Sequence, residues 1–540
     1  MSIYVTEKFT PAEAIILKRY FTNLDKPVFA LVNLPEVVKG ALFARYSRSP
    51  KSLRRLFLDE FVGDLDLEGD ITLDATIGLK RAEQLYEKVF FEYGDDSVAQ
   101  LGGVHLACEQ SSNLLTKILE WSRLQAYLEQ STRYIAYDTR LTNGLYRYYR
   151  DKQILDSKLG AIFVGQMDTI FDNYSSILKN IIGYLNTTYS KPKGDSDFVW
   201  RQAIRAKALD TTRGLLPAGA LSNVGIYGTG QSFELLIMKL RASLLPEANY
   251  YAKMITHELK KVIPSFLSRV DRKDRGVAWS GYFLDNNARV NSLVKEVLSV
   301  DSKSVAQNAN SENIVKLVSY DKDGQDKIIA NILYAHSNIS LDILMDKAKK
   351  MPFEQKKALF ETYVGDRQNR RHKPGRAFES CRYEFDIVSD YGAFRDLQRH
   401  RMLTIEWQDF SPNLGYSVPA LIKQANQTDL YERTFDISRS LYYKLADHFE
   451  QQAPYSLCLG FNVRYRMEMN AREAMHLIEL RSSPQGHASY RQVAQKMHEL
   501  IAGKAKHGLV ADSMKYVDYS DNDFERLDAL RRLEKKSVIS

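Results

Sequence analysis

The segment Glu234-Leu-Leu-Ile-Met-Lys-Leu-Arg241 returns in altered form as Ala474-Met-His-Leu-Ile-Glu-Leu-Arg481. Each copy has apolar residues three and four positions apart, which predicts an amphipathic helix ending in Leu-Arg. A basic or polar cluster lies upstream of each, Trp121-Ser-Arg123 in one half and Arg399-His-Arg401 in the other. The shared order of these features predicts a diverged tandem duplication.

Periodicity elsewhere predicts a helix-rich chain. Three- and four-residue spacing of apolar side chains favours helices over residues 52–61 and 429–448. Alternation of polar and apolar residues predicts strands over Arg382–Val388 and, in part, Ser456–Val463. The expected fold is therefore α+β, with two tandem domains that each hold a small mixed or antiparallel sheet and surrounding helices.

A chain of 540 residues and 62.0 kDa exceeds what one core usually serves, so it predicts two to four domains. Residues 301–313 are polar and lack an apolar stripe, as expected of a linker. We place the two domains at residues 1–290 and 315–540. The Gly-rich run Gly225–Gly230 lacks the spacing of a dinucleotide fingerprint, and we expect a loop there.

Composition narrows the class of protein. The chain is 44% hydrophobic and 26% charged, which excludes a disordered or fibrous protein. With 75 Lys and Arg against 67 Asp and Glu the net charge is +8, which fits anionic small ligands as well as nucleic acid. Cys108, Cys381 and Cys458 form no CxxC pair, so neither a disulfide framework nor a metal site is expected. The start of the sequence has no signal-peptide pattern, and we expect a cytoplasmic protein.

Two short clusters combine groups that bind anions. Arg399-His400-Arg401, expected on a helix, offers planar guanidinium donors around an ionisable ring. The same three residues would also fit a basic turn that only contacts solvent. Ser131 and Arg133 are two residues apart and can face one anion in an extended segment. Ser131 could instead cap a helix, with Arg133 solvated.

These stretches together resemble the flavin-dependent thymidylate synthases. Each half carries part of the signature of that family. The second half retains its Arg-His-Arg, Asn-x-Arg and Leu-Arg motifs as Arg399-His400-Arg401, Asn470-Ala-Arg472 and Leu480-Arg481, with Thr404 in place of a Ser. The first half retains Glu129-Gln-Ser-Thr-Arg-Tyr134, Arg213-Gly-Leu-Leu-Pro217 and Leu240-Arg241, but has Trp121-Ser-Arg123, Ala126 and Ser232 at three other motif positions.

The resemblance implies an activity and a set of ligands. The family methylates dUMP to dTMP with FAD, taking the carbon from methylene-tetrahydrofolate and electrons from NADPH, without a cysteine nucleophile. Its cofactor residues correspond to Arg399, His400, Arg401, Asn470 and Arg472. Its dUMP residues correspond to Glu129, Gln130, Ser131, Arg133, Arg213 and Arg481. The uracil-polarising guanidinium corresponds to Arg481, and to Arg241 in the other copy.

The resemblance also implies a homodimer, because the family forms homotetramers and each chain here would supply two copies. Two other interpretations stay open. Divergence of the motifs could leave a flavin- or nucleotide-binding homologue without turnover. Alternatively, the substrate is another pyrimidine, including one within RNA, which the basic patches at residues 45–55 and 367–373 would accommodate.

Overall fold

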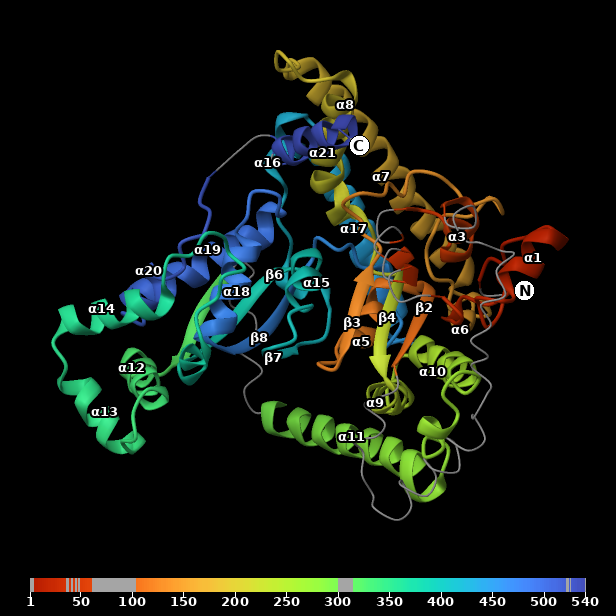
Figure 1. Ribbon diagram of the computed structural model, residues 1–540. Coiled ribbons are helices and arrows are strands. Elements are labelled where there is room, and N and C mark those ends of the chain that lie inside the picture. The colour runs from red at the N-terminus through yellow and green to blue at the C-terminus, as the bar shows by residue number, and fades with distance from the viewer. Residues whose placement is uncertain are drawn as a thin grey trace. The chain divides into compact units, whose positions relative to one another are not determined.

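The computed structural model, shown in Figure 1, describes residues 4–34, 38–39, 42–43, 46, 49–60, 103–299, 314–520, 524 and 526–539. Its chain divides into two compact units. Unit 1 comprises Met1–Ser175, Pro217–Gln307 and Asp436–Leu457. Unit 2 comprises Ser176–Leu216, Asn308–Phe435 and Cys458–Ser540.

Unit 1 is built on a four-stranded sheet in the order β1-β2-β4-β3, with every neighbouring pair antiparallel. The strands are β1 (Val28–Leu31), β2 (Gly103–Ser112), β3 (Gln125–Glu129) and β4 (Leu221–Thr229). Three helices pack on them: α5 (Asn113–Leu119), α9 (Gly230–Arg241) and α10 (Pro246–Leu259). The predicted helix over 234–241 is therefore the second part of α9.

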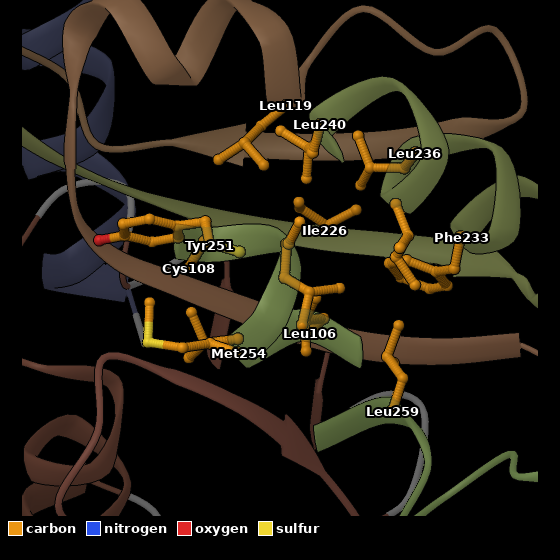
Figure 2. Packing of buried hydrophobic residues seen from close by; sticks show 14 of the residues in the cluster. Leu106, Cys108, Leu119, Ile226, Phe233, Leu236, Leu240, Tyr251, Met254 and Leu259 are labelled. Atoms are coloured by element: carbon orange, nitrogen blue, oxygen red, sulfur yellow. The ribbon is translucent and has the colours of Figure 1, made fainter. Parts of the chain in front are cut away.

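The core of unit 1 lies between this sheet and these helices, as Figure 2 shows. Leu106 and Ile226 of the two central strands are fully buried and face Phe233 of α9. Tyr251 of α10 closes the other side and donates its hydroxyl to the Glu109 carbonyl at 2.6 Å. The 2-residue period of the strands and the 3- to 4-residue period of the helices bring these apolar faces together.

Unit 2 repeats the arrangement. Its sheet has the order β5-β6-β8-β7, again antiparallel throughout, with β5 (Ile314–Tyr320), β6 (Arg382–Asp390), β7 (Thr404–Trp407) and β8 (Asn462–Asn470). Helices α15 (Tyr391–Leu397), α18 (Ala471–Arg481) and α19 (Ala488–Gly503) lie beside β6 and β8 (Figure 1). The same strand order in both units confirms the predicted α+β class with two tandem sheets.

Two local predictions were wrong. In the segment Ser456–Val463 only Asn462 and Val463 belong to a strand, because the 3-10 turn η8 (Ala453–Ser456) and a further turn at residues 459–460 precede it. Residues 225–229 are part of strand β4 instead of a loop. Glycine is needed there because neighbours approach closely: a Cβ on Gly225 would lie 2.8 Å from the Phe43 ring.

The two units exchange segments of chain. Helix α7 (Gly160–Thr188) begins in unit 1, and its end, α8 (Asp197–Thr212) and η3 (Arg213–Leu215) belong to unit 2. Conversely, α17 (Thr428–Ala446) begins in unit 2, and its end and η8 belong to unit 1. The division into domains at residues 1–290 and 315–540 stays a prediction. Each compact unit contains one segment from the other half of the sequence, residues 436–457 in unit 1 and residues 176–216 in unit 2. The linker at 301–313 lies outside the described residues, as do residues 45, 47 and 48 of the basic patch at 45–55. Within that patch, Arg54 is buried near Glu109, and Arg55 pairs with Glu7 and Glu13.

The other helical segments of the described residues complete the two units. They are α1 (Pro11–Leu17), α3 (Leu53–Glu60), α6 (Lys152–Leu155), η4 (Ser265–Leu267), η5 (Lys273–Val277), α11 (Ala278–Ser299), α12 (Gly324–Ala335), α13 (Leu341–Lys350), α14 (Phe353–Val364), η6 (Arg376–Ser380), η7 (Pro412–Leu414), α16 (Ala420–Gln424), α20 (Gly508–Asp512) and α21 (Leu527–Ile539). Within the described ranges, no helix combines the length and apolar character that crossing a membrane requires.

Candidate functional site in unit 2

The Arg399-His400-Arg401 motif lies on a turn after α15, so the helix expected there was wrong. Helix α15 starts at the N-cap Asp390, whose carboxylate accepts from the Ala393 N–H at 2.8 Å. It ends at Leu397, and the His400 N–H turns back to the Leu397 carbonyl at 3.2 Å. The chain must leave the helix here because β7 begins at Thr404 to pair with β8.

A buried carboxylate, Asp396, joins three arginines of the predicted site. It accepts a hydrogen bond from Arg213 Nη1 at 3.1 Å and pairs with Arg399 Nη2. Arg481 Nη1 lies 4.0 Å from the same carboxylate. Because guanidinium groups are permanently charged, one carboxylate offsets only part of their positive charge.

His400 connects this group to α18. Arg481 Nε donates to His400 Nε2 at 3.0 Å, and His400 Nδ1 lies 3.0 Å from the Glu473 carboxylate. Since a guanidinium can only donate, Nε2 is the bare nitrogen and the proton sits on Nδ1, facing Glu473. Burial, together with the nearby Arg481 charge, holds the pKa of His400 well below its usual range. The imidazole is therefore neutral at physiological pH.

Helix α18 places two more titratable groups beside this ring. The Asn470 side chain caps the helix by accepting from the Glu473 N–H at 2.9 Å, and Glu473 and His476 share one face three residues apart. Burial raises the pKa of Glu473 to about 7, against the lowering effect of Lys373 and Arg472. Burial also lowers the pKa of His476 to about 4.

The side chains of His400, Glu473 and His476 are close enough to share a cation, with one ligand atom of each within 4.8 Å of the others. Two observations disfavour that use. Both ring nitrogens of His400 already have protein partners, and Lys373, Arg399 and Arg481 act on the ring as positive charges. The surroundings favour a bound anion over a bound metal ion.

Arg213 belongs to the first-half motif but to unit 2, through the exchanged segment. Its side chain is only 4% exposed. Nη2 lies 3.7 Å from the Asp390 carboxylate, beyond hydrogen-bond reach, and it has no hydrogen-bond partner among the described residues. A buried N–H donor without a partner costs free energy, which marks this guanidinium as one that a ligand could complete.

The loop at residues 366–374 brings further positive charge. Its base is Arg367, whose guanidinium donates to both Glu479 oxygens at 2.7 and 2.5 Å and to the Ser513 carbonyl at 2.7 Å. Arg472 donates through Nε to the Pro374 carbonyl at 2.9 Å. Arg401, the last residue of the Arg-His-Arg motif, is exposed.

The predicted dUMP segment of the first half lies in unit 1, at the end of β3. Glu129 is buried 3.4 Å from Lys117 Nζ, and the Gln130 side chain donates to the Ser49 carbonyl at 2.7 Å. Ser131 Oγ accepts from the Arg133 N–H at 3.2 Å within a turn, and no helix begins there. The Arg133 side chain is largely buried.

Arg241, the first-half counterpart of Arg481, has a different environment. Its guanidinium donates to the Asp271 carboxylate at 2.7 Å and to the Val270 carbonyl at 2.9 Å. No Arg-His-Arg motif accompanies it, because residues 121–123 are Trp-Ser-Arg. Among the predicted residues, unit 2 thus gathers Arg213, Arg399, His400 and Arg481, while Arg241 belongs to unit 1.

Sequence reasoning missed the carboxylates of the site, Asp390, Asp396 and Glu473. Two of them had a signal in the sequence. Asp390 directly follows the alternating strand pattern, as a helix N-cap does, and Glu473 stands three residues after Asn470 in a capping arrangement. Asp396 had none, since its partner Arg213 is 183 residues away.

Two sheets with one strand order, each with its own helices, define a tandem duplication of an α+β module. Two segments of the chain, residues 49–265 and 316–505, match the family described as thymidylate synthase complementing protein, Thy1. The chain belongs to this family.

Two relatives match this chain over nearly its whole length. A UPF0159 protein of Chlamydia pneumoniae is 38% identical over 534 residues, covering 98% of both chains. The UPF0159 protein Ta1429 of Thermoplasma acidophilum is 30% identical over 518 residues, covering 91% of this chain and 97% of its own. A solved UMP/dUMP methylase, PolB from Streptomyces cacaoi, is similar over 38% of this chain and 95% of its own, at 16% identity and a TM-score of 0.31.

Proposed function

We propose that unit 2 carries an FAD-dependent thymidylate synthase activity, the reductive methylation of dUMP to dTMP with methylene-tetrahydrofolate and NADPH. Membership of the Thy1 family supports this reaction class. The observation that carries the proposal is the position of Arg213. A substrate-motif residue of the first half shares the Asp396 carboxylate with Arg399 and lies beside Arg481 in the same unit.

Arg481 is the proposed catalytic cation. A uracil ring that attacks an electrophile develops negative charge on its carbonyl oxygens, which a fixed guanidinium stabilises without a proton transfer. The Arg481 Nε–H donates to the neutral His400 ring, which fixes the plane of the guanidinium. This hydrogen bond does not use the two Nη groups of Arg481. His400 in turn is oriented by Glu473. His400 thus acts as a positioning residue toward Arg481, besides its proposed contact with flavin.

The residues around His400 fit an anionic cofactor. Lys373, Arg399, Arg472 and Arg481 all raise the local positive potential. When bound, reduced flavin supplies the electrons that complete the methyl group, and NADPH replenishes them. Arg399, Arg401 and Arg472 would hold the anionic and carbonyl groups of the cofactor, while the Asn470 oxygen, already used as a helix cap, would act by positioning α18.

The dUMP phosphate is the proposed partner of Arg213. Its Nη2 is a buried donor with no partner among the described residues, and a charge-assisted bond to phosphate is roughly twice as strong as a neutral one. Glu129, Gln130, Ser131 and Arg133 remain proposed substrate residues on the motif alone.

The test uses the purified full chain. An absorbance spectrum should show flavin, and dUMP should stimulate NADPH oxidation in the presence of methylene-tetrahydrofolate with formation of dTMP. Arg481→Ala should keep the flavin and lose on the order of 10²- to 10³-fold in turnover, as expected for one stabilising donor. Arg382→Ala is the matched control, because that arginine lies in the same unit with its side chain 72% exposed.

Three results would contradict the proposal in different ways. No flavin after incubation with FAD would remove the cofactor assignment of Arg399 and His400. Flavin without turnover on dUMP would favour the binding homologue, and turnover on another pyrimidine or on RNA would favour the related flavoenzyme. Equal losses in Arg481→Ala and Arg382→Ala would remove the catalytic role of Arg481.

A further inference from the structure

Helix α11 exposes a continuous apolar stripe. It spans 22 residues, Ala278–Ser299, and follows directly on the π-turn η5. Seven large apolar side chains along it are 45–62% exposed: Trp279, Tyr282, Val290, Leu293, Val294, Val297 and Leu298. Scattered exposed apolar residues need no explanation, but a contiguous stripe on one helix marks an interaction surface.

The stripe has the spacing of a coiled-coil seam. Trp279, Phe283, Asn286, Val290, Leu293 and Val297 follow one another at intervals of four, three, four, three and four residues. This is the a/d pattern of a heptad repeat, with β-branched Val290 and Val297 at a positions and Leu293 at a d position. The single polar residue on the seam, Asn286, occupies a d position, where burial of its amide lowers the stability of a pair unless the amide finds a hydrogen-bond partner.

The charges beside the seam indicate which partner fits. Arg289 and Glu296 occupy successive g positions, seven residues apart and therefore too far apart to pair within one helix. In an antiparallel pair of α11 helices with Val290 opposite Leu293 of a second copy, each Arg289 meets a Glu296 of the other chain. A parallel pair would set Arg289 opposite Val294 and gain nothing from either charge.

The helix is also separate from the family's own module. The Thy1 matches end at residue 265 and resume at residue 316, so α11 lies in the segment that joins the two copies. An interface on α11 is therefore an addition of the fused chain. The described charges on the helix, Asp285, Arg289, Lys295 and Glu296, sum to zero, which offers an anionic membrane surface no net attraction.

We propose that α11 is a self-association helix, which pairs antiparallel with α11 of a second copy of this chain through the seam Trp279–Val297. Such a contact is isologous, since each copy presents the same surface. It joins chains independently of the flavin chemistry.

The test is the mass of the full chain by sedimentation equilibrium over a range of concentrations. The wild type should self-associate in multiples of 62.0 kDa. Leu293→Glu should halve that mass with its helix content retained, because it sets a charge into the seam. Lys295→Ala, on the outer side of the same helix, is the matched control and should leave the mass unchanged.

A charge exchange tests the antiparallel register. Arg289→Glu alone should weaken association about tenfold, since two like-charge contacts replace two favourable ones, and Arg289→Glu with Glu296→Arg should restore it. A wild type that stays monomeric, a Leu293→Glu chain with unchanged mass, or monomers that float with anionic vesicles through α11 would each overturn the proposal. A double variant no stronger than the single one would overturn the register.

Discussion

The buried ion pair between Arg367 and Glu479 should control the stability of the cationic loop at residues 366–374. Both side chains are only 1% exposed. The Arg367 guanidinium donates to both Glu479 oxygens, to the Ser513 carbonyl and to the His372 carbonyl, so it ties the loop to α18. In Arg367→Met the Glu479 carboxylate would keep the Tyr516 N–H, at 3.3 Å, as its remaining partner.

The expected cost follows from burial. Removing one member of a buried pair leaves an uncompensated charge and costs about 3–5 kcal/mol. At ~1.4 kcal/mol per factor of ten, amides of the loop and of the adjoining turn of α18 should exchange with deuterium about 10²- to 10³·⁵-fold faster. Hydrogen exchange read by mass spectrometry measures this locally, which avoids treating a chain with two units as a two-state folder.

Two further variants make the result decisive. Arg376→Ala removes an arginine of the neighbouring turn that pairs with Glu379 at 3.2 Å but is 86% exposed, and an exposed pair contributes close to nothing. Arg367→Met with Glu479→Met should recover most of the loss, because apolar side chains of similar size replace the pair. A less than tenfold change in Arg367→Met, or one equal to that of Arg376→Ala, would refute the reasoning.

Other predictions concern titration and reactivity. Burial raises the pKa of Glu247 from 4.5 to about 7, so between these pH values the folded form holds a proton that the unfolded form has lost. The stability that this group contributes therefore falls as the pH rises through that window. Glu247→Gln should flatten the pH dependence of the urea midpoint in this window, and an unchanged slope would contradict the prediction. Burial lowers the pKa of His400, so the stability that this group contributes is lost as the pH falls below about 6.5. His400→Asn should therefore make unit 2 less sensitive to acid. A variant as acid-sensitive as the wild type would count against a neutral buried ring. Cys108 and Cys381 are buried with raised pKa values, about 12 for Cys381, so a thiol reagent should label them only after denaturation, and rapid labelling of the native chain would argue against their burial.

Local patterns were enough to predict the fold class and some of its elements. Alternation identified β6 from Arg382 onward, and helical spacing identified the ends of α9 and α18 at Arg241 and Arg481. The glycine-containing strand β4 was misjudged, because its need for Gly225 comes from the Phe43 ring, 182 residues earlier, and leaves no local mark. Local signals fail where a distant neighbour decides the conformation.

Motif resemblance named the cations of the cluster around Asp396 but none of its carboxylates. Motif resemblance gave Arg399, His400 and Arg481, and the structure brings those three together. Spacing along the chain gave no means of knowing that Arg213 joins them, since that depends on which unit receives the exchanged segment. The same exchange determines which buried groups each unit contains.

The exchange is reciprocal, residue by residue. In unit 1 the Gly219 N–H donates to the Tyr455 carbonyl at 2.8 Å, and in unit 2 the Gly460 N–H donates to the Gly214 carbonyl at 2.8 Å. These matching bonds show that Tyr455 in unit 1 occupies the position that Gly214 occupies in unit 2. The preceding residue is therefore Pro454 in unit 1 and Arg213 in unit 2. The first unit therefore lacks the buried guanidinium by construction.

Chemistry around that position differs accordingly. In unit 1 the Tyr455 hydroxyl donates to the Glu247 carboxylate at 2.8 Å, and Ser112 donates to it through both its N–H and its hydroxyl, at 2.8 and 2.6 Å. In unit 2 the acid is instead Asp390, at the helix N-cap that corresponds to Ser112, and it faces Arg213. A carboxylate satisfied by three neutral donors is a structural network, whereas a carboxylate beside an incompletely bonded guanidinium leaves room for an anion. With Arg241 also paired to Asp271, we expect one FAD and one dUMP per chain, bound in unit 2, and a titration that gives two of either per chain would show that unit 1 has kept a site.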